Sequence, residues 1–169
     1  AAFGPALKPA VPTLALNFSD STSFDGNTLF SFGLDGADEV AQLVRAARAE
    51  GFAHALVLAD NAESSQRQVA EFERLWPQSG ARVLGTLRLG DLNEFRRRFE
   101  EALLFEQSRQ RSAALARLLG MELVTEPRRR QDLDLVVMFA GPVPARSLRP
   151  LVSFLYAGDL PVWAGSQTS

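Results

Sequence analysis

The sequence contains no cysteine, a single histidine (His54) and a single lysine (Lys8). The missing cysteines exclude disulfides, thiolate nucleophiles and cysteine-based zinc sites. The lysine stands in the proline-rich entry segment 1–12, which disfavours a Schiff base or a phosphate-binding lysine elsewhere in the chain. No apolar run approaches the roughly 20 residues that span a bilayer, and the N-terminus lacks the basic and apolar regions of a signal peptide. If the protein is exported, we expect those parts to have been removed.

Charge is nearly balanced over the 169 residues, with a formal net charge of −2. General affinity for nucleic acid needs a basic field that displaces counterions from phosphate, so this balance disfavours a nucleic-acid partner. Two arginine triplets, 96–98 and 128–130, stand out locally. A solvated helix face and a solvated loop explain them most simply, and a contact with an anion or a partner is the alternative.

Length and composition predict one domain with a substantial core, because 46% of the residues are hydrophobic and 22% are charged. Short apolar runs between polar loops predict strands at 13–17, 53–59, 82–89, 133–140 and 160–164. The segment 29–32 is a further candidate strand. Helical spacing of apolar residues predicts helices over 37–50, around Val69–Trp76, from Leu92 with a break near Gln107, and around Leu148–Leu155. Pro150 predicts a kink or a late start in the last helix.

Alternating strands and helices predict an α/β fold, in which a doubly wound, mostly parallel sheet lies between two layers of helices, giving three layers. The run 82–89 is less evenly apolar than the others, which indicates a strand near an edge of the sheet. In such a sheet, ligands usually meet the loops at the carboxyl ends of the strands. Any chemistry should therefore be sought in those loops.

The strand-end loops supply weak ligand-binding candidates, namely Asn17, Ser19, Asp60, Asn61, Ser64 and Ser65. Ser64 and Ser65 stand near a helix N-terminus, where hydroxyls and backbone N–H groups can bind an anion. A turn or a helix cap explains Asp60 and the two serines equally well. The loops contain no dinucleotide-binding, P-loop or nucleophile-elbow motif. We therefore predict no catalytic residue, no metal and no cofactor.

His54 stands beside an apolar strand rather than in a strand-end loop. A catalytic triad would place it near a loop nucleophile, and a zinc site would need further strong ligands. Its position favours a structural role.

Three segments toward the C-terminus have a distinctive residue sequence in addition to their periodic pattern: Glu126–Asp134, Ala145–Pro150 and Phe154–Val162. The arginine-rich segment and the turn YAGDLP carry most of the signal. With supporting similarity at 12–17 and 30–34, these segments resemble the C-terminal domain of the LppC/LpoA lipoproteins, a family of penicillin-binding protein activators. The resemblance runs over most of the chain.

The resemblance implies a type I periplasmic-binding-protein-like fold, in which two α/β lobes flank a cleft. Residues 1–169 suffice for one lobe, as a fragment of a larger lipoprotein. The family also implies a location in the periplasm of Gram-negative bacteria, with anchoring in the outer membrane through an N-terminal lipid outside this chain. The implied function is non-catalytic: binding and stimulating a class A penicillin-binding protein, which is a peptidoglycan synthase.

Two alternatives stay open at this point. The same fold suits the small-molecule-binding lobe of a periplasmic solute-binding protein or sensor, with a ligand in the interlobe cleft near Asn17 and Asp60. An enzyme is the other alternative, and it would need a catalytic group supplied by the second lobe.

Overall fold

The computed structural model describes residues 11–15, 29–31, 36–121, 128–154 and 158–166. Its main body is built on four parallel strands in the order β4-β3-β5-β6. Their bounds are β3 His54–Ala59, β4 Arg82–Arg88, β5 Leu135–Phe139 and β6 Val162–Ala164. β3 pairs with both β4 and β5, so the two most continuously apolar runs lie at the centre and β4 lies at the edge, as predicted.

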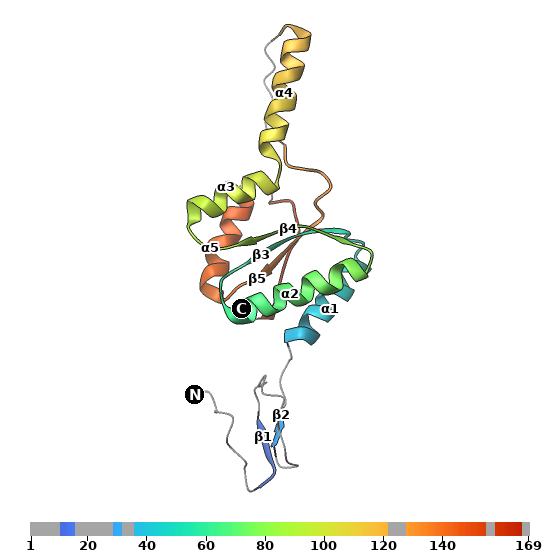
Figure 1. The fold of residues 1–169 in the computed structure, drawn as a ribbon, viewed down its shortest axis with the longest axis vertical. Coiled ribbons are helices and arrows are strands. Elements are labelled where there is room, and N and C mark those ends of the chain that lie inside the picture. Colours follow the sequence, from blue (N-terminus) through green and yellow to red (C-terminus); the bar gives the residue numbers. More distant parts are fainter. Residues whose placement is uncertain (1–10, 16–28, 32–35, 122–127, 155–157, 167–169) are drawn as a thin grey trace.

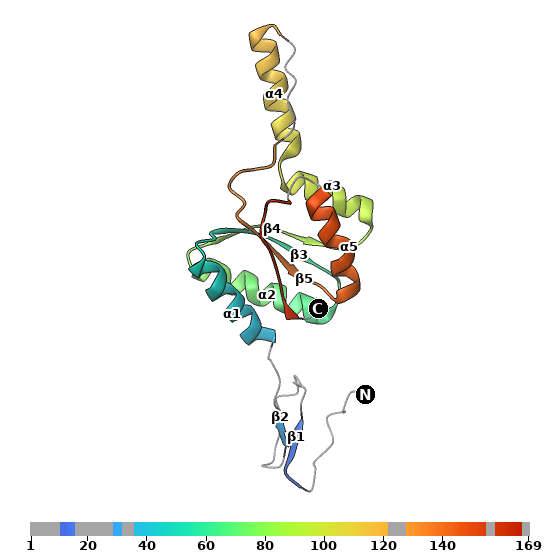
Figure 2. The ribbon, with the colours of Figure 1, turned by 180° about the vertical axis from the view of Figure 1, so that it is seen from behind.

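Helices cover both faces of this sheet (Figures 1 and 2). On one face, α1 Gly36–Ala49 and α2 Glu63–Gln78 form a core with the strand residues Ala55, Val57 and Ala59. On the other, α3 Leu92–Ala102 and α5 Pro142–Val152 pack on Leu56 and Leu58. Successive residues of β3 therefore face opposite layers, as strand geometry requires. The predicted three-layer, doubly wound α/β fold is confirmed.

The first two strands do not join this sheet. β1 Thr13–Ala15 and β2 Leu29–Ser31 pair in parallel with each other as a separate two-stranded sheet. The expectation that the run 13–17 belongs to the main sheet is therefore wrong. An apolar run indicates a strand, but the strand it pairs with is chosen by contacts distant in sequence.

The predicted break between two helices exists, but it lies before Gln107. α3 ends at Ala102 and α4 Phe105–Leu119 begins after Leu104, whose φ of 60° lies in the left-handed region. Leu103 and Phe105 are both buried on either side of it. Their burial anchors the turn in the core, and the polar stretch that suggested the later position forms helix instead.

The prolines of α5 also differ from expectation. α5 starts at Pro142 and contains Pro150, so the late start is wrong. Proline suits the first helical position because that residue needs no N–H partner, and Pro150 comes only two residues before the helix ends.

Candidate functional site

Asp60 lies at the centre of the carboxyl edge of the sheet, directly after β3. Its Oδ2 accepts a hydrogen bond from the backbone N–H of Gly141 at 2.8 Å, and its Oδ1 accepts one from Ala62 N–H at 3.0 Å. Burial by itself raises the pKa of Asp60, but interactions with the Ser65 hydroxyl and the two backbone N–H groups outweigh burial and hold the pKa below its usual range. Asp60 is thus an ionised turn residue that ties the ends of β3 and β5 together.

Of the neighbouring candidate residues, Asn61 makes structural hydrogen bonds, whereas the hydroxyl of Ser65 has no hydrogen bond among the described residues. Asn61 donates from Nδ2 to the carbonyl of Leu89 at 2.7 Å and accepts from Gln66 on its own carbonyl at 3.0 Å. Ser65 is 1% exposed. Its hydroxyl interacts with the Asp60 carboxylate, but it forms no hydrogen bond with any described residue. Ser64 is half-buried in the first turn of α2. Ala62, not a serine, is the N-cap, and it makes no side-chain capping bond.

Asn17 and Ser19 lie outside the described residues. The structure therefore brings Asp60, Asn61, Ser64 and Ser65 together at the carboxyl end of β3.

A second polar cluster at the same edge was not predicted from the sequence. Glu39 of α1 accepts hydrogen bonds from Gln68 of α2, at 3.3 Å, and from the backbone N–H of Ser166. Gln68 is buried, and a Cβ on Gly165 would stand 3.3 Å from the Glu39 carboxylate. The glycine at 165 allows this close approach. Glu39 and Gln68 are 29 residues apart, and neither belongs to a motif that could have indicated their contact.

His54 lies at the opposite, amino-terminal edge of the sheet. Its Nδ1 is 3.3 Å from Asp134 Oδ2, and that same oxygen accepts the backbone N–H groups of Ala53 at 3.0 Å and of His54 at 2.9 Å. Asp134 therefore joins the beginnings of β3 and β5, and His54 has the structural setting that was predicted. Among the described residues no group of three or more His, Cys, Asp or Glu side chains is arranged to hold a metal ion.

The arginine triplets have different environments. Arg96, Arg97 and Arg98 are exposed on α3 and pair with glutamates four residues away, which fits the solvated helix face. In the second triplet, by contrast, Arg129 is 14% exposed and pairs with Asp159 at 2.5 Å. Arg130 is 17% exposed and forms two 2.7 Å hydrogen bonds with Asp132. The prediction of a solvated loop is therefore wrong for these two side chains, which make internal ion pairs.

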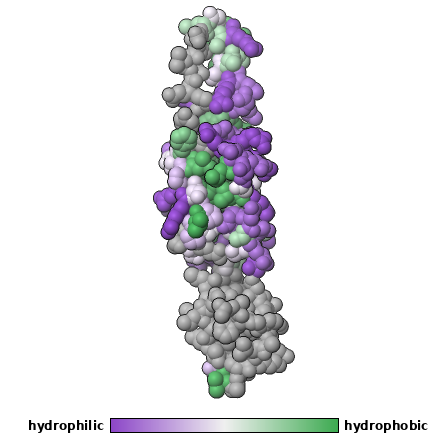
Figure 3. Space-filling model, turned by 90° about the vertical axis from the view of Figure 1, so that its left-hand side faces the viewer, coloured by the Kyte–Doolittle hydropathy of each residue, from purple (hydrophilic) through white to green (hydrophobic). Residues whose placement is uncertain are grey.

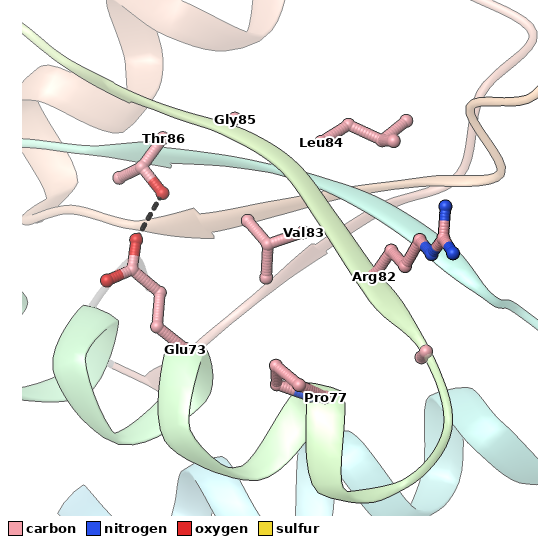
Figure 4. A pocket seen from close by; sticks show the side chains of 8 residues that line it. Glu73, Pro77, Arg82, Val83, Leu84, Gly85 and Thr86 are labelled. Atoms are coloured by element: carbon pink, nitrogen blue, oxygen red, sulfur yellow. Dashed lines mark hydrogen bonds between the residues drawn. The ribbon is translucent and has the colours of Figure 1, made fainter.

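An open hollow of about 570 Å³ lies between the end of α2 and the edge strand β4 (Figure 4). Pro77 and Val83 contribute apolar surface, and Thr86 Oγ1 donates to Glu73 Oε1 at 2.5 Å across its rim. This hollow contains none of the predicted strand-end residues.

The surface that carries α3 and α5 has both hydrophilic and hydrophobic areas (Figure 3). Hydrophilic side chains gather along one border of this face, with a smaller apolar group at its centre. The exposed large apolar residues of these two helices include Leu92 and Val143. None of the described helices combines the length and the hydropathy needed to cross a membrane.

The fold and the strand-end geometry can be set beside known proteins. Residues 5–169 match the family model described as the LppC putative lipoprotein. This chain belongs to the LppC family. Among the curated relatives of this LppC chain is the penicillin-binding protein activator LpoA of Vibrio antiquarius, 27% identical over 149 residues, covering 88% of this chain and 24% of the relative. The LpoA of Vibrio cholerae is 28% identical over 142 residues, covering 84% and 23%.

Solved structures support the fold of this LppC chain. The C-domain of LpoA from Haemophilus influenzae aligns with a TM-score of 0.51 and 18% identity over 92% of this chain and 40% of its own. A solute-binding protein of an R. palustris ABC transporter, in complex with 4-hydroxybenzoate, aligns with a TM-score of 0.61 and 11% identity, covering 94% and 37%. The fold is thus periplasmic-binding-protein-like. The chain spans about a quarter of the length of the curated relatives it matches.

Proposed function

We propose that this LppC chain is a non-catalytic part of a periplasmic activator that binds and stimulates a class A penicillin-binding protein during peptidoglycan synthesis. The observation that carries the proposal is the family match over residues 5–169, together with relatives named as activators of penicillin-binding proteins. The site geometry agrees, because Asp60 and Asn61 at the carboxyl edge are engaged in internal hydrogen bonds rather than arranged as a nucleophile and its base.

The same proposal covers domain organisation and location. Residues 1–169 form a single α/β lobe of a larger lipoprotein, and segment 1–12 is the entry into it. The full-length protein is anchored in the outer membrane by an N-terminal lipid and extends into the periplasm. This proposal is supported by the relatives, because the chain covers only 24% and 23% of the length of the two LpoA proteins.

The test uses the full-length activator and a purified class A synthase. We expect the activator to retain the synthase in a pull-down and to increase the rate at which it polymerises peptidoglycan. A class B penicillin-binding protein is the control and is expected to show neither effect. Absence of both binding and stimulation by the full-length protein would contradict the proposal.

A small-molecule-binding lobe is the second candidate function. It is supported by the likeness in fold to solute-binding proteins and by the buried Ser65 hydroxyl without a hydrogen bond in the described part of the chain. In this proposal, Asn17, Ser19, Asp60, Asn61, Ser64 and Ser65 bind a small ligand in the interlobe cleft. A ligand must then replace or bridge the internal bonds of Asp60 and Asn61.

Thermal unfolding of the full-length protein with amino acids, aromatic acids and peptidoglycan fragments tests this candidate. A ligand at about 100 times its dissociation constant adds roughly 2.7 kcal/mol of stability and raises the melting temperature. No shift with any of these compounds would count against it.

A further inference from the structure

Helix α4 projects away from the rest of the described structure (Figures 1 and 2). Its buried residues lie only in its first turns. Phe105 and Ser108 in its first turns are buried, and Ser108 Oγ accepts a hydrogen bond from the backbone N–H of Arg128 at 3.0 Å. No described residue beyond Ser108 in this helix is buried. The helix therefore rests on the body at one end and extends into solvent at the other.

The exposed end of α4 carries large apolar side chains. Leu115 is 52% exposed, Leu118 83%, Leu119 61% and Met121, just after the helix, 58%. The three leucines are spaced i, i+3 and i+4, which places them on one face. Leu115 follows Ser108 by seven residues, so the leucine face continues the face that is buried at the start of the helix. We call these four residues the α4 tip.

Arg111 comes four residues before Leu115 and therefore lies on the same face of α4 as the leucines. Within the described residues it forms no ion pair or hydrogen bond, whereas Arg109 of the same helix pairs with Glu106 at 3.4 Å. On α3, each arginine of the triplet 96–98 pairs with a glutamate of that helix. Among the described residues, the leucine face of α4 thus carries a cation without a counter-charge, unlike the paired arginines of α3.

We propose that the α4 tip docks into an apolar groove with an acidic rim on the synthase; this inference rests on the function proposed above. The three exposed leucines at the end of α4 fit helix-in-groove recognition, in which residues spaced i, i+3 and i+4 are the anchors. Arg111, on the leucine face, selects a partner surface of opposite charge. A second copy of this chain is a poorer occupant, because pairing two leucine faces would bring the Arg111 side chains of both copies into one interface.

The experiment measures the affinity of the full-length protein for the purified class A synthase by surface plasmon resonance. One variant carries Leu115→Ser and Leu118→Ser, and a second carries Arg111→Glu. The matched control is Val143→Ser on α5, where the apolar side chain is 74% exposed, a fraction between those of Leu115 and Leu118. Circular dichroism checks that each variant is folded, which we expect because all the substituted side chains are exposed.

We expect the leucine variant to bind on the order of tenfold more weakly or worse, as for anchor residues, and the control to bind like the wild type. The arginine variant should associate more slowly, and its association rate should depend less on salt. Wild-type affinity in a folded leucine variant overturns the inference and leaves the proposed function intact. Absence of binding by the wild type overturns both.

Sedimentation velocity separates the remaining possibility of self-association. One combination of results would overturn the inference: the wild type dimerises, the leucine variant stays monomeric, and both bind the synthase with the same affinity. The α4 tip would then be a contact between two copies of the chain.

Discussion

Asp60, at the end of β3, accepts a 2.8 Å hydrogen bond from the backbone N–H of Gly141, which follows β5 and lies 81 residues further along the chain. The same carboxylate accepts from Ala62, so one buried side chain holds the turn into α2 and the start of α5. Removing this group should loosen both helix starts together.

We predict that Asp60→Ala lowers the free energy of unfolding by about 1–3 kcal/mol, because two backbone N–H groups in partly buried hydrogen bonds lose their acceptor. Asp60→Asn retains one carbonyl oxygen and should lose less. Urea denaturation followed by circular dichroism measures both, with Asp91→Asn, which retains a capping oxygen at the exposed start of α3, as the control. Equal stability of Asp60→Ala and the wild type would show that the bond to Gly141 is not needed.

The pair between Arg130 and Asp132 predicts a pH dependence. Hydrogen bonding to Arg130, the largest cause, lowers the pKa of Asp132 to about 2 from 3.8. Because the folded-state pKa is depressed, the ionised carboxylate contributes stability above about pH 4, and this contribution disappears as the pH falls toward 2. Asp132 is 53% exposed, so solvent screening limits the effect to about 1 kcal/mol or less.

Unfolding of Asp132→Asn and of the wild type, compared between pH 6 and pH 2, tests this pair. We expect the wild type to be more stable at pH 6 and the difference to vanish near pH 2. A difference that stays constant over this range would rule out the ionised carboxylate as its source.

Phe72 is fully buried beneath the sheet, with its ring stacked on Trp76 at 5.1 Å between centroids and set edge-on to Phe139 at 5.9 Å. We predict that Phe72→Ala costs about 3–5 kcal/mol, since it removes the ring contacts and leaves a cavity. Leu92→Ala, at a side chain that is 55% exposed, should change stability by about 0.5 kcal/mol or less. Thermal denaturation measures the loss of stability in both variants. A loss at Phe72 as small as that at Leu92 would contradict the close packing of the Phe72 ring.

Leu104 connects α3 to α4 with a φ of 60°, a conformation that β-branched residues adopt poorly. Leu104→Val should therefore lower stability by about 1–2 kcal/mol, whereas Leu104→Gly should leave it similar or slightly higher, because glycine takes a positive φ without steric cost. Chemical denaturation of the two variants measures this. The opposite ranking would mean that side-chain packing, not backbone conformation, decides the residue at 104.

The sequence predicted the main elements well where one physical signal dominates. Continuous apolar runs located β3 and β5, and the uneven run 82–89 correctly indicated an edge strand. Errors occurred where the outcome depends on distant contacts. The break at Leu104 follows from burial of its neighbours Leu103 and Phe105, and the separate pairing of β1 with β2 follows from which strands meet in space.

The candidate site shows the same division. A polar residue directly after a buried strand marked Asp60, because the carboxyl ends of parallel strands gather at one edge. Its partner Gly141 and the contact of Glu39 with Gln68 and Ser166 carry no local signal. The prediction of a solvated loop failed at Arg129 and Arg130, since Asp159, the partner of Arg129, lies 30 residues away.

The linear order of residues was enough to determine the α/β class, the two helical layers and the membership in the LppC family, because these depend on periodic burial and on short distinctive segments. Only the tertiary structure decided which charges are neutralised and which apolar face stays open. Arg129 and Arg130 pair with aspartates while Arg111 has no partner among the described residues, and the leucines of α4 have the same helical spacing as core residues yet remain exposed. Spacing places side chains on one face of a helix, but only the position of that helix in space decides whether another surface covers the face.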